Sequence, residues 1–242
     1  LPTAPPAGAN ATTCYIGGNT LLGPTGSGGY YFALPLMGGA DSNVIENNKF
    51  LDYYFYGAYL SASKHNIVRN NEFSRPTKTS VTTFYGAYLT GATEGTVIEG
   101  NKVHSPGGTT TNATVTGYGI YYLGSGTAAS PVKIANNAIY KMNTGGTSYG
   151  IYLSGATHTK VLHNTIVYDQ IQTGTSTQAG IWVLGTNTGL EIMNNNIAIT
   201  GGNLGVKYGI NYTTAVSLTS IADAQRNNIY VNSTQAGLQW YA

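Results

Sequence analysis

The chain has 242 residues, with 11 Lys plus Arg against 9 Asp plus Glu, so its formal net charge is +2. Charged residues make up 8% of it, against about 25% in an average soluble domain, which excludes a basic surface dense enough to bind nucleic acid by electrostatics. No apolar run approaches the roughly 20 residues of a membrane span. The abundance of Gly, Thr and Asn disfavours helices, and the single cysteine excludes an internal disulfide.

The first 40 residues carry proline and glycine runs without a clear repeat. We therefore expect residues 1–40 to form an irregular N-terminal segment that caps the fold, with a candidate first strand at 15–18 and a candidate early coil at 30–36. From residue 41 to residue 242, two short patterns alternate along the chain, which predicts one repeating domain.

The first pattern is a five-residue strand with glycine in second place, beginning as Tyr-Gly-Ala-Tyr-Leu. It recurs at residues 56–60, 85–89, 118–122, 149–153, 179–183, 208–212 and 236–240. The second pattern is an aliphatic residue, an Asn three positions later and an apolar residue two positions after that. It recurs at residues 45–50, 68–73, 98–103, 134–139, 161–166, 192–197 and 224–229.

A period near 30 residues, with short strands and no helical segment, predicts a solenoid of about seven to eight β coils. Strict alternation along the glycine-centred strand places Ala58 and Leu60 in the core and Gly57 and Tyr59 outside. By the same parity, the column of Tyr56 belongs to the edge of the core at a coil corner. The two apolar ends of the Asn pattern lie five apart, so we expect a bend at the Asn, a residue that tolerates the left-handed conformation.

Together these patterns resemble the right-handed parallel β-helix, the pectin-lyase-like fold shared by polysaccharide lyases, phage tailspikes and many bacterial surface proteins. The resemblance covers about residues 40–242 and implies an all-β, single-solenoid fold, without indicating one function. It also implies an inward ladder in which one Asn of each coil stacks on the next. The ladder residues would be Asn48, Asn71, Asn101, Asn137, Asn164, Asn195 and Asn227.

Enzymes with the fold that this chain resembles use acidic clusters or calcium-carboxylate sites. A glycosidase needs two carboxylates beside the scissile bond. The four Asp residues of this chain, Asp41, Asp52, Asp169 and Asp223, are far apart in sequence. The pattern therefore favours a protein that is not an enzyme. The four histidines lack the spacing of metal ligands, so we expect no metal site and no cofactor.

Several charged residues align in register on successive coils, which lie about 4.8 Å apart. We expect them to form outer salt-bridge ladders that hold the coils in register, each pair contributing about 0–1 kcal/mol. One ladder is Glu46, Arg69 and Glu99, and the other is Lys49, Glu72 and Lys102.

The candidate binding surface is an outward aromatic strip beside a trough of outward glycines. Its members are Tyr59, Tyr88, Tyr121, Tyr152 and Trp182. Three interpretations remain open: a stack that fixes register, an interface with another protein, and a strip that grips a polysaccharide through its ring faces.

The leading functional hypothesis is a non-catalytic extracellular β-helix, a structural or adhesive segment of a cell-surface adhesin, filament or sheath. Sparse charge, few thiols and abundant Thr favour an extracellular or cell-surface location. The expected partner is a second copy or a neighbouring protein, bound through the aromatic strip or an open C-terminal end, or a polysaccharide. The alternatives are a polysaccharide lyase, hydrolase or glycan-binding module, and a piece of a phage tailspike or fibre.

Overall fold

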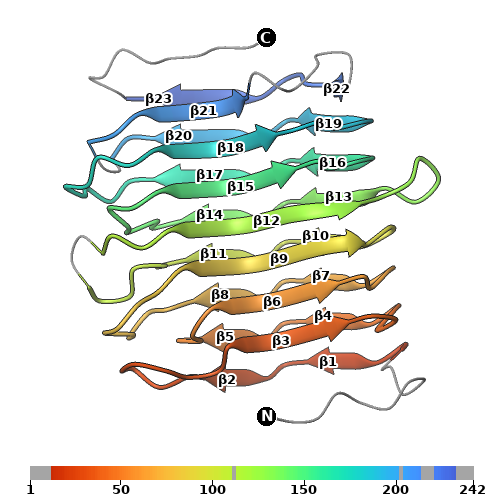
Figure 1. Ribbon diagram of the computed structural model, residues 1–242, viewed down its shortest axis with the longest axis horizontal. Helices are drawn as coiled ribbons and strands as arrows, with labels where there is room; N and C mark the ends of the chain where they lie inside the picture. The colour runs from red at the N-terminus through yellow and green to blue at the C-terminus, as the bar shows by residue number, and fades with distance from the viewer. Residues whose placement is uncertain (1–11, 111–112, 202–203, 214–220, 233–242) are drawn as a thin grey trace.

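The computed structural model describes residues 12–110, 113–201, 204–213 and 221–232. Within these residues the chain forms β-strands without a helix and winds into a parallel solenoid of about seven turns, with about 30 residues in each turn. Figure 1 shows the coils stacked in chain order from β1–β3 to β21–β23. The described ranges contain no helix long and apolar enough to cross a membrane.

Each coil contributes one strand to each of three parallel sheets, except that the described residues of the last coil contribute to two of them. Sheet A contains β1 (Tyr15–Gly17), β4 (Val44–Glu46), β7 (Ile67–Arg69), β10 (Val97–Glu99), β13 (Val132–Ala135), β16 (Thr159–Leu162), β19 (Leu190–Met193) and β22 (Ile221–Asp223). Sheet B contains β2 (Thr20–Leu22), β5 (Lys49–Leu51), β8 (Glu72–Ser74), β11 (Lys102–His104), β14 (Ala138–Tyr140), β17 (Thr165–Tyr168), β20 (Asn196–Ile199) and β23 (Asn228–Val231). Sheet C contains β3 (Phe32–Met37), β6 (Tyr56–Ser61), β9 (Phe84–Ala92), β12 (Gly117–Ser125), β15 (Ser148–Ser154), β18 (Gln178–Leu184) and β21 (Lys207–Tyr212).

The first coil lies inside the segment for which the sequence predicts an irregular cap. Strands β1, β2 and β3 pair in register with β4, β5 and β6, so Tyr15 already lies in the solenoid. The candidate first strand at 15–18 corresponds to β1, and the candidate early coil at 30–36 overlaps β3. The last glycine-centred pattern, at residues 236–240, lies outside the described residues.

The predicted Asn ladder is confirmed and runs between sheets A and B. In each coil the backbone N–H and the Nδ2 of the ladder Asn both donate to Oδ1 of the next ladder Asn, at 2.9–3.1 Å. Nδ2 also donates to a backbone carbonyl of the preceding coil. Asn19 adds an earlier member that the sequence pattern did not identify. The amide side chains therefore satisfy the buried polar groups that the bend creates.

The bend itself is left-handed, as predicted. The residue before each of the seven predicted ladder Asn residues has φ between 54° and 67°. Asn tolerates this region better than most side chains, and Gly100 occupies it freely. A second, shorter ladder is formed by Asn residues that precede strands of sheet A. Asn43 donates to Oδ1 of Asn66 through both its backbone N–H and its Nδ2. Its two members lie outside the pattern on which the sequence prediction depended.

The core is a set of inward columns. Ala58 and Leu60 are fully buried as predicted, and Phe50 stacks on Phe73 inside the solenoid at 5.1 Å between ring centroids. Each coil leaves its apolar side chains half covered until the next coil is added, so the burial of apolar surface drives the stacking.

Candidate functional site

The predicted aromatic strip lies on the outer side of sheet C and is half-exposed. Its rings stack face to face from coil to coil: centroids are 5.3 Å apart for Tyr59–Tyr88, 4.8 Å for Tyr88–Tyr121 and 4.7 Å for Tyr121–Tyr152, with interplanar angles of 7–14°. Since the strands are in register, each ring lies one coil repeat from the next. The four tyrosines of the strip thus form one continuous stack along the solenoid axis.

A second aromatic column stands beside the first, so the prediction that Tyr56 and its equivalents face the core edge is wrong. Tyr85 and Tyr118 stack at 4.8 Å and 4°, and Tyr85 meets Tyr88 edge-on at 5.2 Å and 89°. Between tyrosines of successive coils in one column the interplanar angle is 4–30°. Between the two columns of one coil it is 55–89°, and offset stacks and edge-on contacts are both favourable for aromatic pairs. We call the two columns the aromatic face: Tyr56, Tyr85, Tyr118, Tyr149 and Tyr208, with Tyr59, Tyr88, Tyr121, Tyr152 and Trp182.

The glycine between the columns explains this correction. A Cβ on Gly57 would lie 2.5 Å from Cδ1 of the core residue Phe73, so Gly57 faces inward and the predicted trough of outward glycines is wrong. Ala58 also faces inward, and the alternation of the strand is therefore interrupted between these two residues. As a result Tyr56 and Tyr59, three residues apart, emerge on the same outer surface with centroids 5.0 Å apart.

The stacking decides what the face offers to a ligand. Tyr56, Tyr85, Tyr88 and Tyr121 have both ring faces covered by stacked rings of neighbouring coils. Burial raises the pKa of Tyr56 and of Tyr149 to about 12, so these hydroxyls stay protonated at neutral pH. A sugar that binds by lying on an aromatic ring needs a free ring face. At these four tyrosines the neighbouring rings already occupy that position.

One irregularity in the face is compensated within its own coil. Ala179 occupies the position of a tyrosine in the second column, that of Tyr56, between Tyr149 and Tyr208. Trp182 of the first column contacts both of these tyrosines, with ring centroids 5.1 Å and 5.7 Å away. The larger indole therefore keeps the aromatic surface continuous across this coil.

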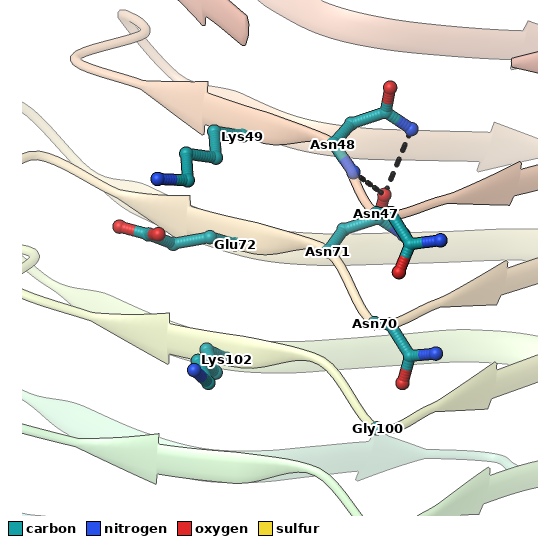
Figure 2. A pocket seen from close by; sticks show the side chains of 8 residues that line it. All are labelled: Asn47, Asn48, Lys49, Asn70, Asn71, Glu72, Gly100 and Lys102. Carbon is teal, nitrogen blue, oxygen red and sulfur yellow. Dashed lines mark hydrogen bonds between the residues drawn. The ribbon is translucent and has the colours of Figure 1, made fainter. Parts of the chain in front are cut away.

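A second surface feature is a groove of ≈ 400 Å³ outside the Asn bend. Figure 2 shows its lining: Asn47, Asn48, Lys49, Asn70, Asn71, Glu72, Gly100 and Lys102. The Asn47 and Asn70 side chains point away from the inner ladder, and the charged side chains stand along sheet B (Figure 2). The groove offers amide and ammonium groups at coil intervals, a chemistry suited to polar ligands.

The charged columns pair differently from the two ladders we expected. Arg69 forms an ion pair with Glu46, whereas Glu99 pairs with Lys133 of the following coil at 3.4 Å. In the other column, Glu72 pairs with His104 at 3.2 Å, and Oε1 of Glu72 also accepts a hydrogen bond from Ser74. The register of the coils brings these charged groups close together. The length and direction of each side chain then determine which of them form an ion pair.

Two buried cationic side chains, those of Arg75 and Lys78, could not be identified from the repeat pattern. Arg75 donates to backbone carbonyls including those of Tyr53 and Thr83, and burial lowers its pKa to about 10. Nζ of Lys78 lies 2.9–3.2 Å from four carbonyl oxygens, those of Pro24, Gly26, Gly28 and Asp52. Both residues follow β8 in a segment that occurs once, and they tie the loops of early coils to each other.

No group of three or more potential metal-ligating His, Cys, Asp or Glu residues occurs among the described residues. His163 is exposed at the left-handed bend, with φ 55°, as expected for a turn residue. His104 differs, because it lies at the end of β11 between Glu72 and Ser105. The sequence pattern does not indicate this contact, since Glu72 comes from the preceding coil.

Comparison with known proteins gives one informative match. A sequence profile of the family described as "Right handed beta helix region" matches residues 7–130. Among solved structures, a trypsin-treated variant of QnrB1, described as a plasmid-mediated fluoroquinolone resistance protein, is similar at 9% identity over 88% of this chain and 90% of that one. Its TM-score of 0.18 is too low to support an argument. No curated protein sequence matches the chain.

Proposed function

We propose that this chain, which belongs to the right-handed β-helix family, is a structural or adhesive protein of the cell surface whose aromatic face binds a second copy of the chain. The observation that carries the proposal is the aromatic face itself. It runs over six strands, from β6 to β21, and presents ring edges and hydroxyls in a rigid array. Tyr and Trp are enriched at protein interfaces because each combines a large apolar area with a polar group.

Low charge on sheet C supports contact between identical copies. Among the residues of β3, β6, β9, β12, β15, β18 and β21, Lys207 alone carries a charge. Two such faces can approach without like-charge repulsion, and an isologous contact requires a surface that complements itself. The sparse charge of the whole chain also supports an extracellular or cell-surface location.

The acidic side chains support a structural use over cleavage of glycosidic bonds. Glu46, Glu94, Glu99 and Glu191 each form an ion pair with a Lys or Arg of a neighbouring coil. Cleavage of a glycosidic bond needs two carboxylates that flank the sugar, one of them in its acid form. Ion pairing instead holds the pKa of Glu46 and of Glu94 below the usual value.

Sedimentation velocity over a range of protein concentrations tests the proposal. We expect association of the wild type and a shift toward monomer for Tyr121→Arg, which places a charge at the centre of the face. Thr165→Arg, at an exposed site on sheet B, is the matched control and should associate like the wild type. A monomeric wild type at all concentrations would refute self-association, and a closed trimer would favour the tailspike alternative.

Glycan binding is a second candidate, and the observation that favours it is the polar groove rather than the aromatic face. Amide and ammonium groups at coil intervals could hydrogen-bond successive sugars of a linear chain. A glycan array distinguishes the two surfaces. Binding that Lys49→Ala and Lys102→Ala abolish, and that Tyr121→Arg leaves intact, would assign it to the groove, whereas no binding on the array would remove this candidate.

A further inference from the structure

A chain of three polar side chains stands at the outer edge of sheet B, beside the groove. Oγ of Ser105 lies 3.0 Å from Nδ1 of His104, and Nε2 of the same imidazole lies 3.2 Å from Oε1 of Glu72. Glu72 is on β8 and His104 on β11, so coil stacking brings the carboxylate to the imidazole. The contacts have the lengths expected when a hydroxyl, a base and an orienting carboxylate are linked.

The carboxylate determines which way the protons point. An ionised Glu72 can only accept hydrogen bonds, so it selects the tautomer of His104 that carries its proton on Nε2. Nδ1 then has a free lone pair, and the hydrogen bond with Ser105 runs from the hydroxyl to the imidazole. Ser105 is thereby held with its proton directed at a base.

The surroundings keep the imidazole neutral and fixed. Burial is the main cause that lowers the pKa of His104, and the ammonium groups of Lys102 and Lys141 lower it further, while Glu72 acts in the opposite direction. The side chain of His104 is 13% exposed, and its ring stacks on Tyr140 with centroids 4.8 Å apart. The imidazole is therefore unprotonated near pH 7 and held in one orientation.

The backbone of Ser105 is equally constrained. It has φ 56°, its N–H donates to the carbonyl of Lys141, and its carbonyl accepts from the N–H of Gly108. The left-handed conformation is common to several corners of the solenoid and includes Ser42, with φ 60°. Ser105 differs from Ser42 in its bond to a histidine, since no described histidine is hydrogen-bonded to Ser42.

We propose that Ser105, His104 and Glu72 form an acyl-transfer site for carboxylic esters, an activity independent of self-association. Ser105 Oγ bonds to the acyl carbon while its proton moves to His104 Nδ1, and the ester C–O bond breaks as the alcohol leaves with that proton. Water then attacks the acyl-serine and gives a proton to Nδ1. The Ser105–acyl bond breaks, Nδ1 returns the proton to Oγ, and the acid is released.

The positive charges of Lys102 and Lys141 favour the step in which negative charge develops on the acyl oxygen. Glu72 acts as a positioning residue, because it holds the imidazole and does not touch the ester. Together the residues provide a nucleophile, a base, an orienting group and a cationic environment, the components needed for acyl transfer.

A fluorophosphonate probe tests the proposal, because it forms a P–O bond with an activated serine and releases fluoride. Peptide mass spectrometry of the full chain should find the adduct on Ser105, with Ser42 unmodified as the internal control. His104→Gln should lower the labelling rate about 100-fold or more, the usual range for loss of a general base. Circular dichroism of each variant establishes that the solenoid has formed.

The pH profile separates an activated serine from an ordinary surface hydroxyl. The labelling rate should rise with pH and level off above a pKa lower than the ordinary histidine value of about 6.5. Glu72→Gln should reduce the plateau rate. Absence of an adduct on Ser105 in the folded protein, equal labelling of Ser42, or a rate that His104→Gln leaves unchanged would each overturn the proposal.

Discussion

Replacing one member of the inner ladder, Asn137, should strongly destabilise the solenoid. Its Nδ2 donates to the carbonyl of Ile98 and to Oδ1 of Asn164, and its Oδ1 accepts from the backbone N–H and the Nδ2 of Asn101. The side chain is 1% exposed, so water cannot replace these bonds. Asn137→Ala removes all four.

The size of the effect follows from those bonds. At about 1 kcal/mol net for each bond, four give a loss of about 4 kcal/mol, and the N–H of Asn101 is left buried without its acceptor. The neighbouring residue provides a matched control. Asn136 has φ 55°, is exposed and donates to Glu99 at the surface, so Asn136→Gly keeps the bend and should change stability by about 0.5 kcal/mol or less.

Urea denaturation followed by circular dichroism gives the two free energies of unfolding. Hydrogen exchange adds a local measurement, because the amide of Asn101 should lose protection in Asn137→Ala and keep it in Asn136→Gly. A loss below about 1 kcal/mol for Asn137→Ala, or equal losses for the two variants, would refute the assignment of stability to the ladder.

Three further predictions concern single sites. Gly150→Ala should lower the free energy of unfolding, measured by urea denaturation, by about 1–3 kcal/mol, because the added Cβ would lie 2.6 Å from the carbonyl oxygen of Gly180. A variant as stable as the wild type would contradict the inward orientation of Gly150. Tyr56, with its pKa raised from 10.0 to about 12, adds stability that is intact below pH 10 and lost as pH rises through about 12. Urea midpoints and phenolate absorbance between these pH values check this, and a flat stability profile would contradict it. Lys78→Met should speed hydrogen exchange at residues 24–29, since it removes the donor from three carbonyls there, and unchanged exchange would show that the loop is held otherwise.

The ladder could be predicted from sequence because its signal is periodic. Every coil repeats an Asn at the same place between two apolar residues, and the five-residue spacing of those residues requires a bend. Local conformation and coil stacking then act on the same residue, so one pattern predicts both.

The direction of the Tyr56 column was predicted wrongly because strict alternation does not continue through Gly57. The sequence held a signal against strict alternation. Tyrosines three residues apart recur in four successive coils, beginning with Tyr56 and Tyr59, and a strand of strict period two cannot place both on one face. A glycine between them, small enough to pack against Phe73 and the next coil, permits the interruption.

Contacts that occur once were beyond prediction. The burial of Lys78 depends on loops that no other coil repeats, and the contact of His104 with Glu72 depends on the diagonal offset between two coils. Such contacts are determined by the length of individual loops and of individual side chains. A repeat pattern contains only the features that all coils share, so it does not predict them.

Photo-crosslinking from the centre of the aromatic face tests the central claim most directly. A benzophenone amino acid at position 88, in an equal mixture of isotopically light and heavy protein, distinguishes links between copies from links within one copy. The account predicts light–heavy links from position 88 to residues of sheet C in a second copy. Links between copies that join other surfaces, or none from position 88, would contradict it.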